Sequence, residues 1–215
     1  MDYIRDPNLV LDLPLYLLDG GSFADKSAYG HLCTVTEALW RPSGRYFDGT
    51  NDAIAVAYSG SLNLTGQFTV MAWVKSSESG NFQGIMGKSG TTAAAIALYR
   101  PSSNVVRLHI YDGAGYEQVD SLTNTWDGSW HHIVGTSSIQ GSTKALNIYI
   151  DGNFEATSAR TRTPASETDQ VWGIGWYGAG GTYIEATIND VLIYSRALTP
   201  AEISHNYIAS KDKYR

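Results

Sequence analysis

Short runs of alternating apolar and polar residues recur along the chain, and turns rich in Gly, Asn, Asp and Ser separate them. This spacing is typical of an antiparallel β-sandwich or barrel, in which each strand turns one face to the core. Between two of the runs, Asp151-Gly152 predicts a tight hairpin, because such a turn needs positive φ at its central residues. The pattern predicts strands at Asp52–Tyr58, Phe68–Lys75, Val105–Tyr111, Tyr116–Leu122, Trp130–Thr136, Leu146–Ile150, Val171–Trp176 and Thr187–Tyr194.

The clearest alternation lies in Val105–Tyr111. Val106 and every second residue after it are apolar, and we expect these side chains to face the core. Arg107, His109 and Tyr111 then form a stripe on the opposite face of the strand. That stripe could serve either a ligand or a neighbouring subunit, since Tyr and Arg are common at both kinds of surface.

One helix is clearly signalled, close to the C-terminus. Thr199 is placed to cap it, Pro200 fits its first turn, and Glu202 can reach back to complete a capping box. Ile203 begins an apolar face that can dock the helix against the edge of the sandwich. We expect the last residues, Lys211–Lys213, to fray.

Composition favours one domain with a neutral polar surface. The 215 residues suffice for a single sandwich with its own core, in which we place the one cysteine, Cys33. Only 17% of the residues are charged and the formal net charge is −6, without a Lys/Arg cluster, so nucleic acid is not an expected partner. The N-terminus lacks the pattern of a signal peptide, and no stretch approaches the ~18 apolar residues of a membrane span. We therefore expect a soluble protein without membrane insertion.

Several segments resemble the laminin-G-like branch of the concanavalin A-like lectin/glucanase superfamily, in that family's order. They are Tyr46–Ile54, Phe68–Lys75, Ser129–Val134 and the C-terminal pair Leu146–Gly152 and Ile188–Ile203. Leu9–Leu15 also resembles the family's first strand. The resemblance implies an all-β fold, an antiparallel two-sheet jelly-roll sandwich with one short C-terminal helix. It implies a laminin-G-like jelly roll over residues 46–215, with residues 1–45 as an N-terminal arm and first strands that pack on it.

The resemblance also implies a structural calcium ion near the sheet edge. Many relatives have an aspartate ligand where this chain has Asn189, and Asp25, Asp48 and the carbonyl of Gly49 are the other candidate ligands. Calcium prefers six to eight oxygens, with carboxylates supplying most of the charge, so Asn189 would weaken the site. The alternative is that these groups cap turns and satisfy backbone amides.

A glucanase-type catalytic pair is absent from the sequence. Such enzymes place two carboxylates on one face of a strand, about 5 Å apart for retaining hydrolysis. Glu117 and Asp120 are an odd number of residues apart, so a regular strand turns them to opposite faces. The five histidines show no metal-ligand spacing. The sequence therefore predicts a protein that is not an enzyme.

Sugar binding needs a flat aromatic face for the C–H side of the ring and polar groups for its hydroxyls. We expect Trp73, Trp130 and Trp172 in the core, whereas Trp126 and Trp176 either pack at an edge or contact a ligand. The candidate ligand-binding residues are Arg107, His109, Tyr111, Tyr116, Trp126, Trp176 and Tyr177.

Two functions fit these features. The first is a non-catalytic, lectin-like domain that binds a glycan or surface polysaccharide. The second is a structural surface subunit of a virion, such as a phage capsid decoration or tail-associated protein, which could also hold glycans. In the second case the chain would form a homo-oligomer or join a larger assembly, with Leu9–Leu18 supplying apolar contacts to the partner. Fold alone does not decide between them.

Overall fold

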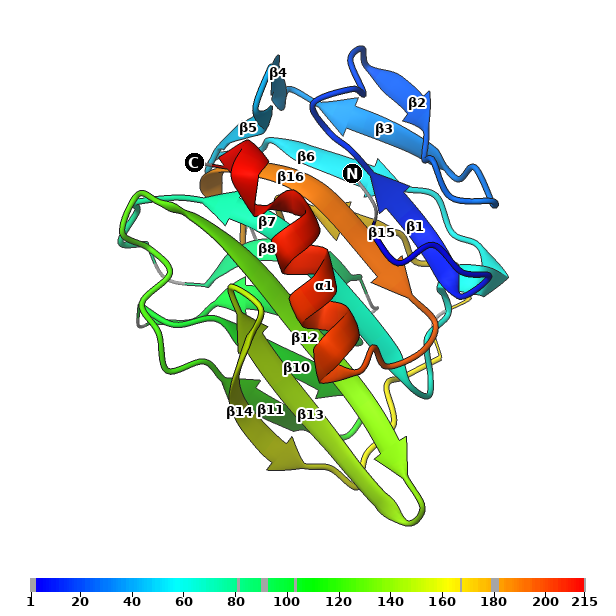
Figure 1. Ribbon diagram of the computed structural model, residues 1–215. Helices are drawn as coiled ribbons and strands as arrows, with labels where there is room; N and C mark the ends of the chain where they lie inside the picture. The colour runs from blue at the N-terminus through cyan, green and yellow to red at the C-terminus, as the bar shows by residue number, and fades with distance from the viewer. Residues whose placement is uncertain are drawn as a thin grey trace.

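The structure is a computed structural model that describes residues 3–80, 82–89, 93–102, 104–166, 168–178 and 182–214. Two antiparallel β-sheets pack face to face, and α1 (Pro200–Ser210) lies across the outer face of one of them (Figure 1). This arrangement confirms the predicted two-sheet jelly-roll sandwich with a short C-terminal helix.

The sheet that carries α1 is called sheet A, and the other is called sheet B. Sheet A has the strand order β14-β13-β12-β7-β16-β5-β4, with β1 also paired to β16. Its strands are β1 (Leu9–Leu13), β4 (Leu39–Arg41), β5 (Gly44–Asp48), β7 (Phe68–Lys75), β12 (Trp130–Gln140), β13 (Thr143–Ile150), β14 (Asn153–Ala159) and β16 (Glu185–Tyr194). Sheet B has the order β11-β10-β9-β8-β15-β6-β3-β2. Its strands are β2 (Ser22–Ala24), β3 (Leu32–Thr36), β6 (Ala53–Val56), β8 (Gln83–Lys88), β9 (Ile96–Arg100), β10 (Arg107–Tyr111), β11 (Tyr116–Asp120) and β15 (Trp172–Ile174).

The main core fills the space between the sheets and follows the predicted alternation. Val106, Leu108 and Ile110 are fully buried there, so the intervening side chains of β10 face outward. The predicted hairpin between β13 and β14 also forms, with φ of 52° at Asp151 and 77° at Gly152. Both values lie in the left-handed region that a tight hairpin turn uses.

The three tryptophans expected in the core do not all lie there. Trp172 is buried in the main core, and Trp73 is also buried as predicted, but on the outer face of sheet A, where its ring stacks on Tyr214. Trp130 is only half-buried, at the start of β12 beside Tyr214, with 4.9 Å between the ring centroids. The expectation for Trp130 was wrong because an aromatic ring at a strand end can be covered by the chain terminus instead of the core.

The N-terminal segment belongs to the sandwich itself. Strand β1 pairs with β16, β4 pairs with β5, and β2 and β3 extend sheet B. Leu9, Leu11, Leu13 and Leu15 are buried within the chain. Within Leu9–Leu18, these four leucines and Leu18 are therefore used by the chain's own core, whereas Leu17 is 62% exposed.

The predicted capping box of α1 is present. The Thr199 side chain accepts from the backbone amide of Glu202, and the Glu202 carboxylate accepts from the amide of Thr199. Ile203 and Leu198 pack with Met71 in a second apolar cluster on the outer face of sheet A. The helix is thus held by its first turn and by one buried face.

The C-terminus is ordered rather than frayed. Lys211–Tyr214 forms a short 3-10 helix, and both the Tyr214 hydroxyl (2.6 Å) and the Lys213 ammonium (3.1 Å) donate to the carboxylate of Asp190. The hydroxyl of Tyr3 donates to the same oxygen at 2.8 Å. The expected fraying is corrected because this carboxylate, only 2% exposed, collects donors from both ends of the chain.

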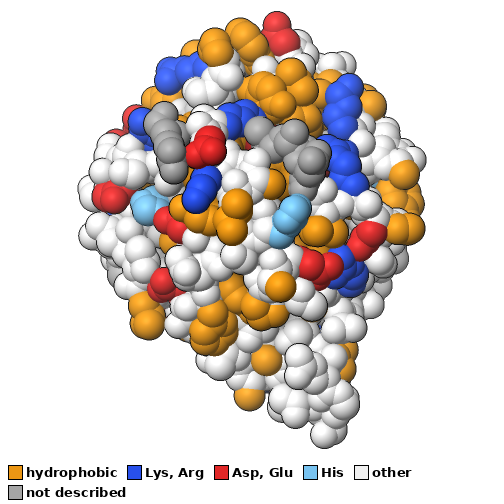
Figure 2. Space-filling model, in the orientation of Figure 1, with side chains coloured by type: hydrophobic (Ala, Val, Ile, Leu, Met, Phe, Trp, Pro, Cys, Tyr) orange, Lys and Arg blue, Asp and Glu red, His pale blue; other side chains and the backbone are white. Residues whose placement is uncertain are grey.

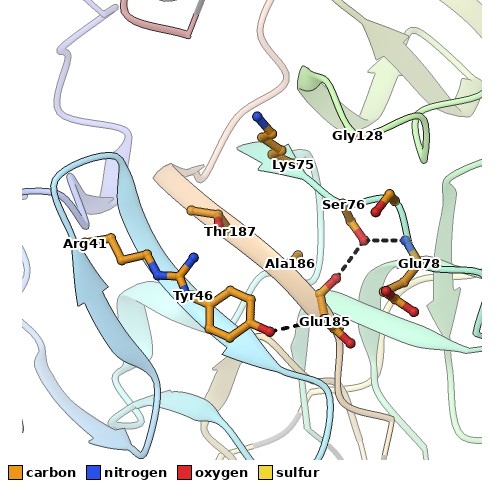
Figure 3. A pocket seen from close by; sticks show the side chains of 10 residues that line it. Arg41, Tyr46, Lys75, Ser76, Glu78, Gly128, Glu185, Ala186 and Thr187 are labelled. Carbon is orange, nitrogen blue, oxygen red and sulfur yellow. Dashed lines mark hydrogen bonds between the residues drawn. The ribbon is translucent and has the colours of Figure 1, made fainter.

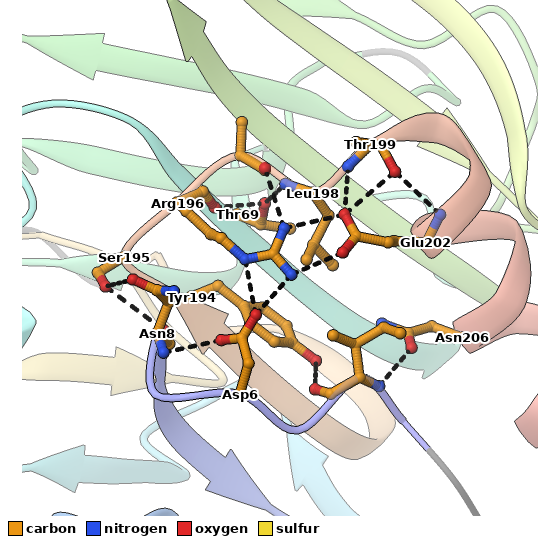
Figure 4. A network of polar contacts seen from close by, with 12 residues as sticks. Asp6, Asn8, Thr69, Tyr194, Ser195, Arg196, Leu198, Thr199, Glu202 and Asn206 are labelled. Carbon is orange, nitrogen blue, oxygen red and sulfur yellow. Dashed lines mark hydrogen bonds and ion pairs between the residues drawn. The ribbon is translucent and has the colours of Figure 1, made fainter.

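A second polar network joins the same regions at the start of α1 (Figure 4). The guanidinium of Arg196 donates to Asp6 at 2.8 Å and to both carboxylate oxygens of Glu202 at 2.9 and 2.7 Å. These hydrogen bonds lower the pKa of Glu202 to about 2, with Arg196 as the main cause. Such two-pronged contacts between Arg and carboxylate are among the stronger hydrogen bonds in proteins.

We expect this network to make stability depend on pH in the acid range. Because the pKa of Glu202 is lower in the folded chain, its stabilising contribution is complete above about pH 4.5 and is lost as the pH falls toward about 2. Allowing for partial exposure, this contribution is about 2 kcal/mol. Urea unfolding of the wild type and Glu202→Gln, at pH 7 and pH 3, measures it. The difference between the two proteins should shrink at pH 3. The exposed Glu37→Gln control should differ little from wild type at either pH.

Candidate functional site

A pocket opens on the outer face of sheet B, where β8, β9, β10 and β11 lie side by side. It has a volume of about 350 Å³, near the lower end for ligand sites in proteins. Strands β9, β10 and β11 supply Tyr99, His109, Tyr116 and Gln118 to its wall, since alternate residues of a strand that do not face the core face this pocket. The pocket is lined by Phe82, Ala93, Ala94, Tyr99, His109, Tyr116, Gln118, Tyr177, Gly178 and Thr182.

Aromatic rings make up the body of this pocket. The Tyr99 ring lies 4.5 Å from the Tyr177 ring and 5.2 Å from the His109 ring, between centroids. His109 in turn contacts Tyr116 edge to face at 5.1 Å. Tyr116 is 53% exposed and so presents much of its side chain to solvent. The arrangement offers several flat apolar faces around one hollow.

Glycines in sheet B let the segment after β15 lie flat on the sheet. A Cβ atom on Gly87 would come within 2.6 Å of the Cβ of Tyr177, and one on Gly173 within 2.5 Å of Trp176 Nε1. A Cβ atom on Gly84 would come within 2.6 Å of backbone atoms of both Trp176 and Tyr177. These positions need glycine because any side chain there would lift Trp176 and Tyr177 off the sheet.

Polar contacts tie both sides of this segment. The Thr182 hydroxyl donates to the carbonyl of Tyr177, and the amide of Gly84 donates to the carbonyl of Thr182 at 3.0 Å. The amide of Gly175 donates to the carbonyl of Ile85 at 2.9 Å. Tyr177 is therefore held on strand β8 through backbone contacts before and after it.

The pocket lining carries no Asp, Glu, Lys or Arg among the described residues. His109 is 4% exposed, and burial lowers its pKa to about 4, so its ring is neutral at pH 7. Its Nε2 lies 3.1 Å from the carbonyl of Ala94 and must carry the proton, because a carbonyl only accepts. Arg107, beside the pocket, donates to both oxygens of Asp120 at 2.6 and 2.7 Å.

The structure gathers most of the sequence-predicted ligand residues here. His109, Tyr116 and Tyr177 line the pocket, and Arg107 lies directly opposite Tyr99 in the pairing of β10 with β9. Tyr111 stands next to them, with its ring 4.7 Å from that of Tyr116. One alternating strand and one downstream segment thus converge on one surface.

Two predicted residues do not join them. Trp126 is only 5% exposed and belongs to the core between the sheets, where its Nε1 donates to the carbonyl of Val105 at 3.1 Å. Its proposed contact with a ligand is corrected, because the polar loop around it folds the indole inward. Trp176 precedes the pocket lining and rests against Gly173 instead, with its indole 6.4 Å from the Tyr183 ring.

Seven lining residues were missed by the sequence reasoning: the small residues Ala93, Ala94 and Gly178, and the larger Phe82, Tyr99, Gln118 and Thr182. Gln118 could have been found, because it alternates with Tyr116 on a predicted strand. Tyr99 lies on β9, which was not predicted as a strand. Phe82 and Thr182 lie in connecting segments, where the sequence has no regular alternation that would show which way a side chain faces.

A second pocket, of about 200 Å³, lies at the ends of β5, β7 and β16 (Figure 3). The Tyr46 hydroxyl donates to Glu185 at 3.1 Å, and the Arg41 guanidinium covers the Tyr46 ring at 4.0 Å from its centroid. The Ser76 hydroxyl donates to the Glu185 carbonyl at 2.6 Å. Because its single aromatic ring is already covered on one face, this pocket offers less to a sugar.

Two of the candidate calcium ligands, Asp48 and Asn189, lie far apart on the sheet. Asp48 pairs with Glu185 on β16, and Asn189 is four residues further along, about 13 Å away by strand geometry. The carboxylate of Asp25 accepts the backbone amides of Asp12, Ser27 and His31. That of Asp48 accepts the amide of Thr50, immediately after Gly49.

Asn189 forms hydrogen bonds to the backbone through both ends of its side-chain amide. Its side-chain oxygen accepts from the amides of Asp190 and Tyr16, and its Nδ2 donates to the carbonyl of Ser43 at 3.1 Å. Asn189 marks the irregularity at which β16 changes from pairing with β5 to pairing with β1. In the structure these residues cap turns and join strands, and Asp48 and Asn189 lie too far apart to share one calcium ion. Among the described residues, no three His, Cys, Asp or Glu side chains are grouped to hold a metal ion.

The two carboxylates that were considered for catalysis, Glu117 and Asp120, form hydrogen bonds with different parts of the chain. Glu117 accepts the amides of Thr161 and Arg162 and so joins β11 to the segment after β14. Asp120 is held by Arg107 on the pocket side. Their opposite orientation agrees with the odd spacing in the sequence and does not form the pair that glycoside hydrolysis requires.

The surface around α1 mixes charges of both signs rather than collecting one sign in a patch (Figure 2). A phosphate backbone would require a continuous basic stripe, which this face lacks. Within the ranges that the structure describes, no helix is both long and apolar enough to cross a bilayer.

Several solved structures share this fold. The receptor-binding domain of botulinum neurotoxin C/D mosaic serotype superimposes with a TM-score of 0.74 at 15% sequence identity, over 94% of this chain and 51% of that one. The binding domain of Paraclostridial Mosquitocidal Protein 1 superimposes with a TM-score of 0.73 at 15% identity, over 94% of this chain and 52% of that one. Trypanosoma rangeli sialidase superimposes with a TM-score of 0.72 at 20% identity, over 97% of this chain and 33% of that one. The chain thus spans about half the length of the two binding domains and about a third of the sialidase.

At these identities the structural likeness shows the fold alone. No curated protein sequence matches the chain. One family model does match, over residues 48–204, which is most of the chain. This family model is that of a laminin G domain within the concanavalin A-like lectin/glucanase superfamily. It covers most of the segments whose resemblance to that family was noted in the sequence. The chain belongs to the concanavalin A-like lectin/glucanase superfamily.

Proposed function

We propose that this protein is a non-catalytic, carbohydrate-binding domain and that the pocket on sheet B is its binding site. The observation that carries the proposal is the cluster of Tyr99, His109, Tyr116 and Tyr177 around one hollow. The C–H face of a sugar ring stacks on flat aromatic rings, and its hydroxyls need hydrogen-bonding groups at the edges of those rings. The Gln118 amide and the tyrosine hydroxyls provide such groups here.

The fold supports this proposal without deciding it. Binding domains of toxins share the fold, and the superfamily includes lectins as well as glucanases. The pocket supplies aromatic faces but no pair of carboxylates, which favours binding over hydrolysis. The alternative of a virion subunit has less support, since most of the apolar N-terminal residues proposed for docking are buried inside the chain.

A glycan array followed by calorimetry on the best ligand tests the proposal, with Tyr116→Ala as the main variant. Tyr116 is 53% exposed, so its truncation should leave the fold intact while removing one face of the pocket. We expect affinity to fall about tenfold or more, as for an aromatic anchor at a binding surface.

The matched control is Tyr29→Ala, which removes an equally exposed tyrosine, 51%, outside the pocket. This variant should bind like the wild type. The proposal is wrong if no glycan binds the wild-type protein, or if Tyr116→Ala binds as well as the control.

A further inference from the structure

We propose that the sheet B pocket selects uncharged sugars and discriminates against uronic and other acidic sugars. This inference rests on the proposed function and names the ligand class of that site. The observation behind it is that a pocket of about 350 Å³ is lined, among the described residues, by aromatic and small uncharged side chains, and that Arg107 beside it is paired with Asp120.

The nearest ion pair is closed on itself. Arg107 engages Asp120 through two parallel hydrogen bonds, at 2.6 and 2.7 Å, and this pairing is the main cause that raises the pKa of Arg107. A carboxylate ligand would have to compete with Asp120 for the guanidinium. Losing a bidentate contact of this kind costs more than a single exposed hydrogen bond gains.

His109 adds no positive charge at neutral pH. Its ring is enclosed by Tyr99, Tyr116 and Tyr177, and its Nε2 proton is directed to the carbonyl of Ala94. Burial, the main cause of its lowered pKa, opposes protonation until about pH 4. No cation is therefore offered to a ligand by the residues that line this pocket.

The tyrosines add no negative charge either. Burial raises the pKa of both Tyr99 and Tyr177, so their hydroxyls remain neutral donors and acceptors. A neutral sugar exchanges water for these groups and for ring faces at little cost. A carboxylate that enters the pocket loses hydration without gaining a counter-charge, and such burial is unfavourable.

The test compares neutral hexose disaccharides with the uronic-acid disaccharides in which the CH₂OH group is replaced by a carboxylate. Isothermal titration at pH 7 measures both series against the full chain. We expect the neutral member of each pair to bind about tenfold more tightly or better. Equal or tighter binding of the uronic acids overturns this inference while leaving the proposed function in place. If neither series binds although the array yields a glycan ligand, this inference fails and the proposed function stands.

A charge variant makes the test specific to this pocket. Gln118 lies opposite His109 in the pairing of β11 with β10, so Gln118→Lys brings a cation to the pocket wall. This variant should lose the preference for the neutral sugars or reverse it. Gln140→Lys places the same charge at the exposed end of β12 and should keep the wild-type preference. The same preference in both variants would contradict the assignment to this pocket.

Discussion

Replacing Asp190 by alanine is expected to lower the free energy of unfolding by about 3 kcal/mol or more. The Asp190 carboxylate accepts from Tyr3, Tyr214 and Lys213 and is almost fully buried. Removing one member of a buried, hydrogen-bonded charge pair leaves its partners unsatisfied, which costs about 3–5 kcal/mol. For a chain of this size, that loss corresponds to a fall in Tm of roughly 6–12 °C.

Calorimetry on a graded set of variants tests this role. Asp190→Asn keeps an accepting oxygen but loses the charge, so we expect a smaller loss of stability. Tyr214→Phe removes one donor and should cost about 1 kcal/mol. In Asp190→Ala the further change Tyr214→Phe should cost almost nothing, since the acceptor is already gone. Asp19→Ala, at an exposed carboxylate, is the control. An Asp190→Ala protein as stable as this control would show that the carboxylate does not hold the termini.

This anchor was beyond the reach of sequence reasoning. Tyr3, Asp190 and Lys213 are far apart along the chain, and nothing in their spacing links them. The short C-terminal segment looks polar and helix-ending, which led to the expectation that it frays. It is ordered because a buried carboxylate at an irregular point of β16 provides the acceptor.

The sequence pattern predicted those features of the fold that depend on residues close together in the chain. The alternation of Val105–Tyr111 placed Arg107, His109 and Tyr111 on the outward face, and the capping box marked the start of α1. Both signals arise within a few residues. Once the core-facing residues of a strand are identified, the residues between them are known to lie on the outer face, where a binding site can form.

The candidate site was only partly predictable for the same reason. Tyr99 lies in the apolar run Ala93–Tyr99, where small alanines hide the alternation with Ile96 and Leu98. Asn189 matched a family metal position, yet its side-chain amide bonds backbone groups of the distant residues Tyr16 and Ser43 as well as the amide of its neighbour Asp190. Trp126 sits among polar residues that suggest exposure, but the loop turns the indole into the core.

Replacing Gly87 by alanine is expected to weaken sugar binding about 30-fold, equivalent to about 2 kcal/mol. The new Cβ would lie 2.6 Å from the Cβ of Tyr177 and 3.1 Å from the carbonyl oxygen of Ile96. Atoms do not approach this closely, so Tyr177 must move away from the sheet and from Tyr99. The pocket would lose the wall that closes it above β8. Titration of the best array ligand measures the loss, and near-UV circular dichroism reports whether the aromatic packing changes.

Two further proteins separate displacement of Tyr177 from general damage to the sheet. Gly21→Ala adds the same methyl group where nothing lies within 4 Å, and it should bind like the wild type. Tyr177→Gly removes the atom that collides, so adding Gly87→Ala to it should weaken binding no further. If the double variant binds much more weakly than Tyr177→Gly alone, Gly87 acts through strand packing and not through the position of Tyr177. If Gly87→Ala binds with wild-type affinity, the aromatic wall over β8 is not part of the sugar site, and recognition must rest on the β10 and β11 side chains.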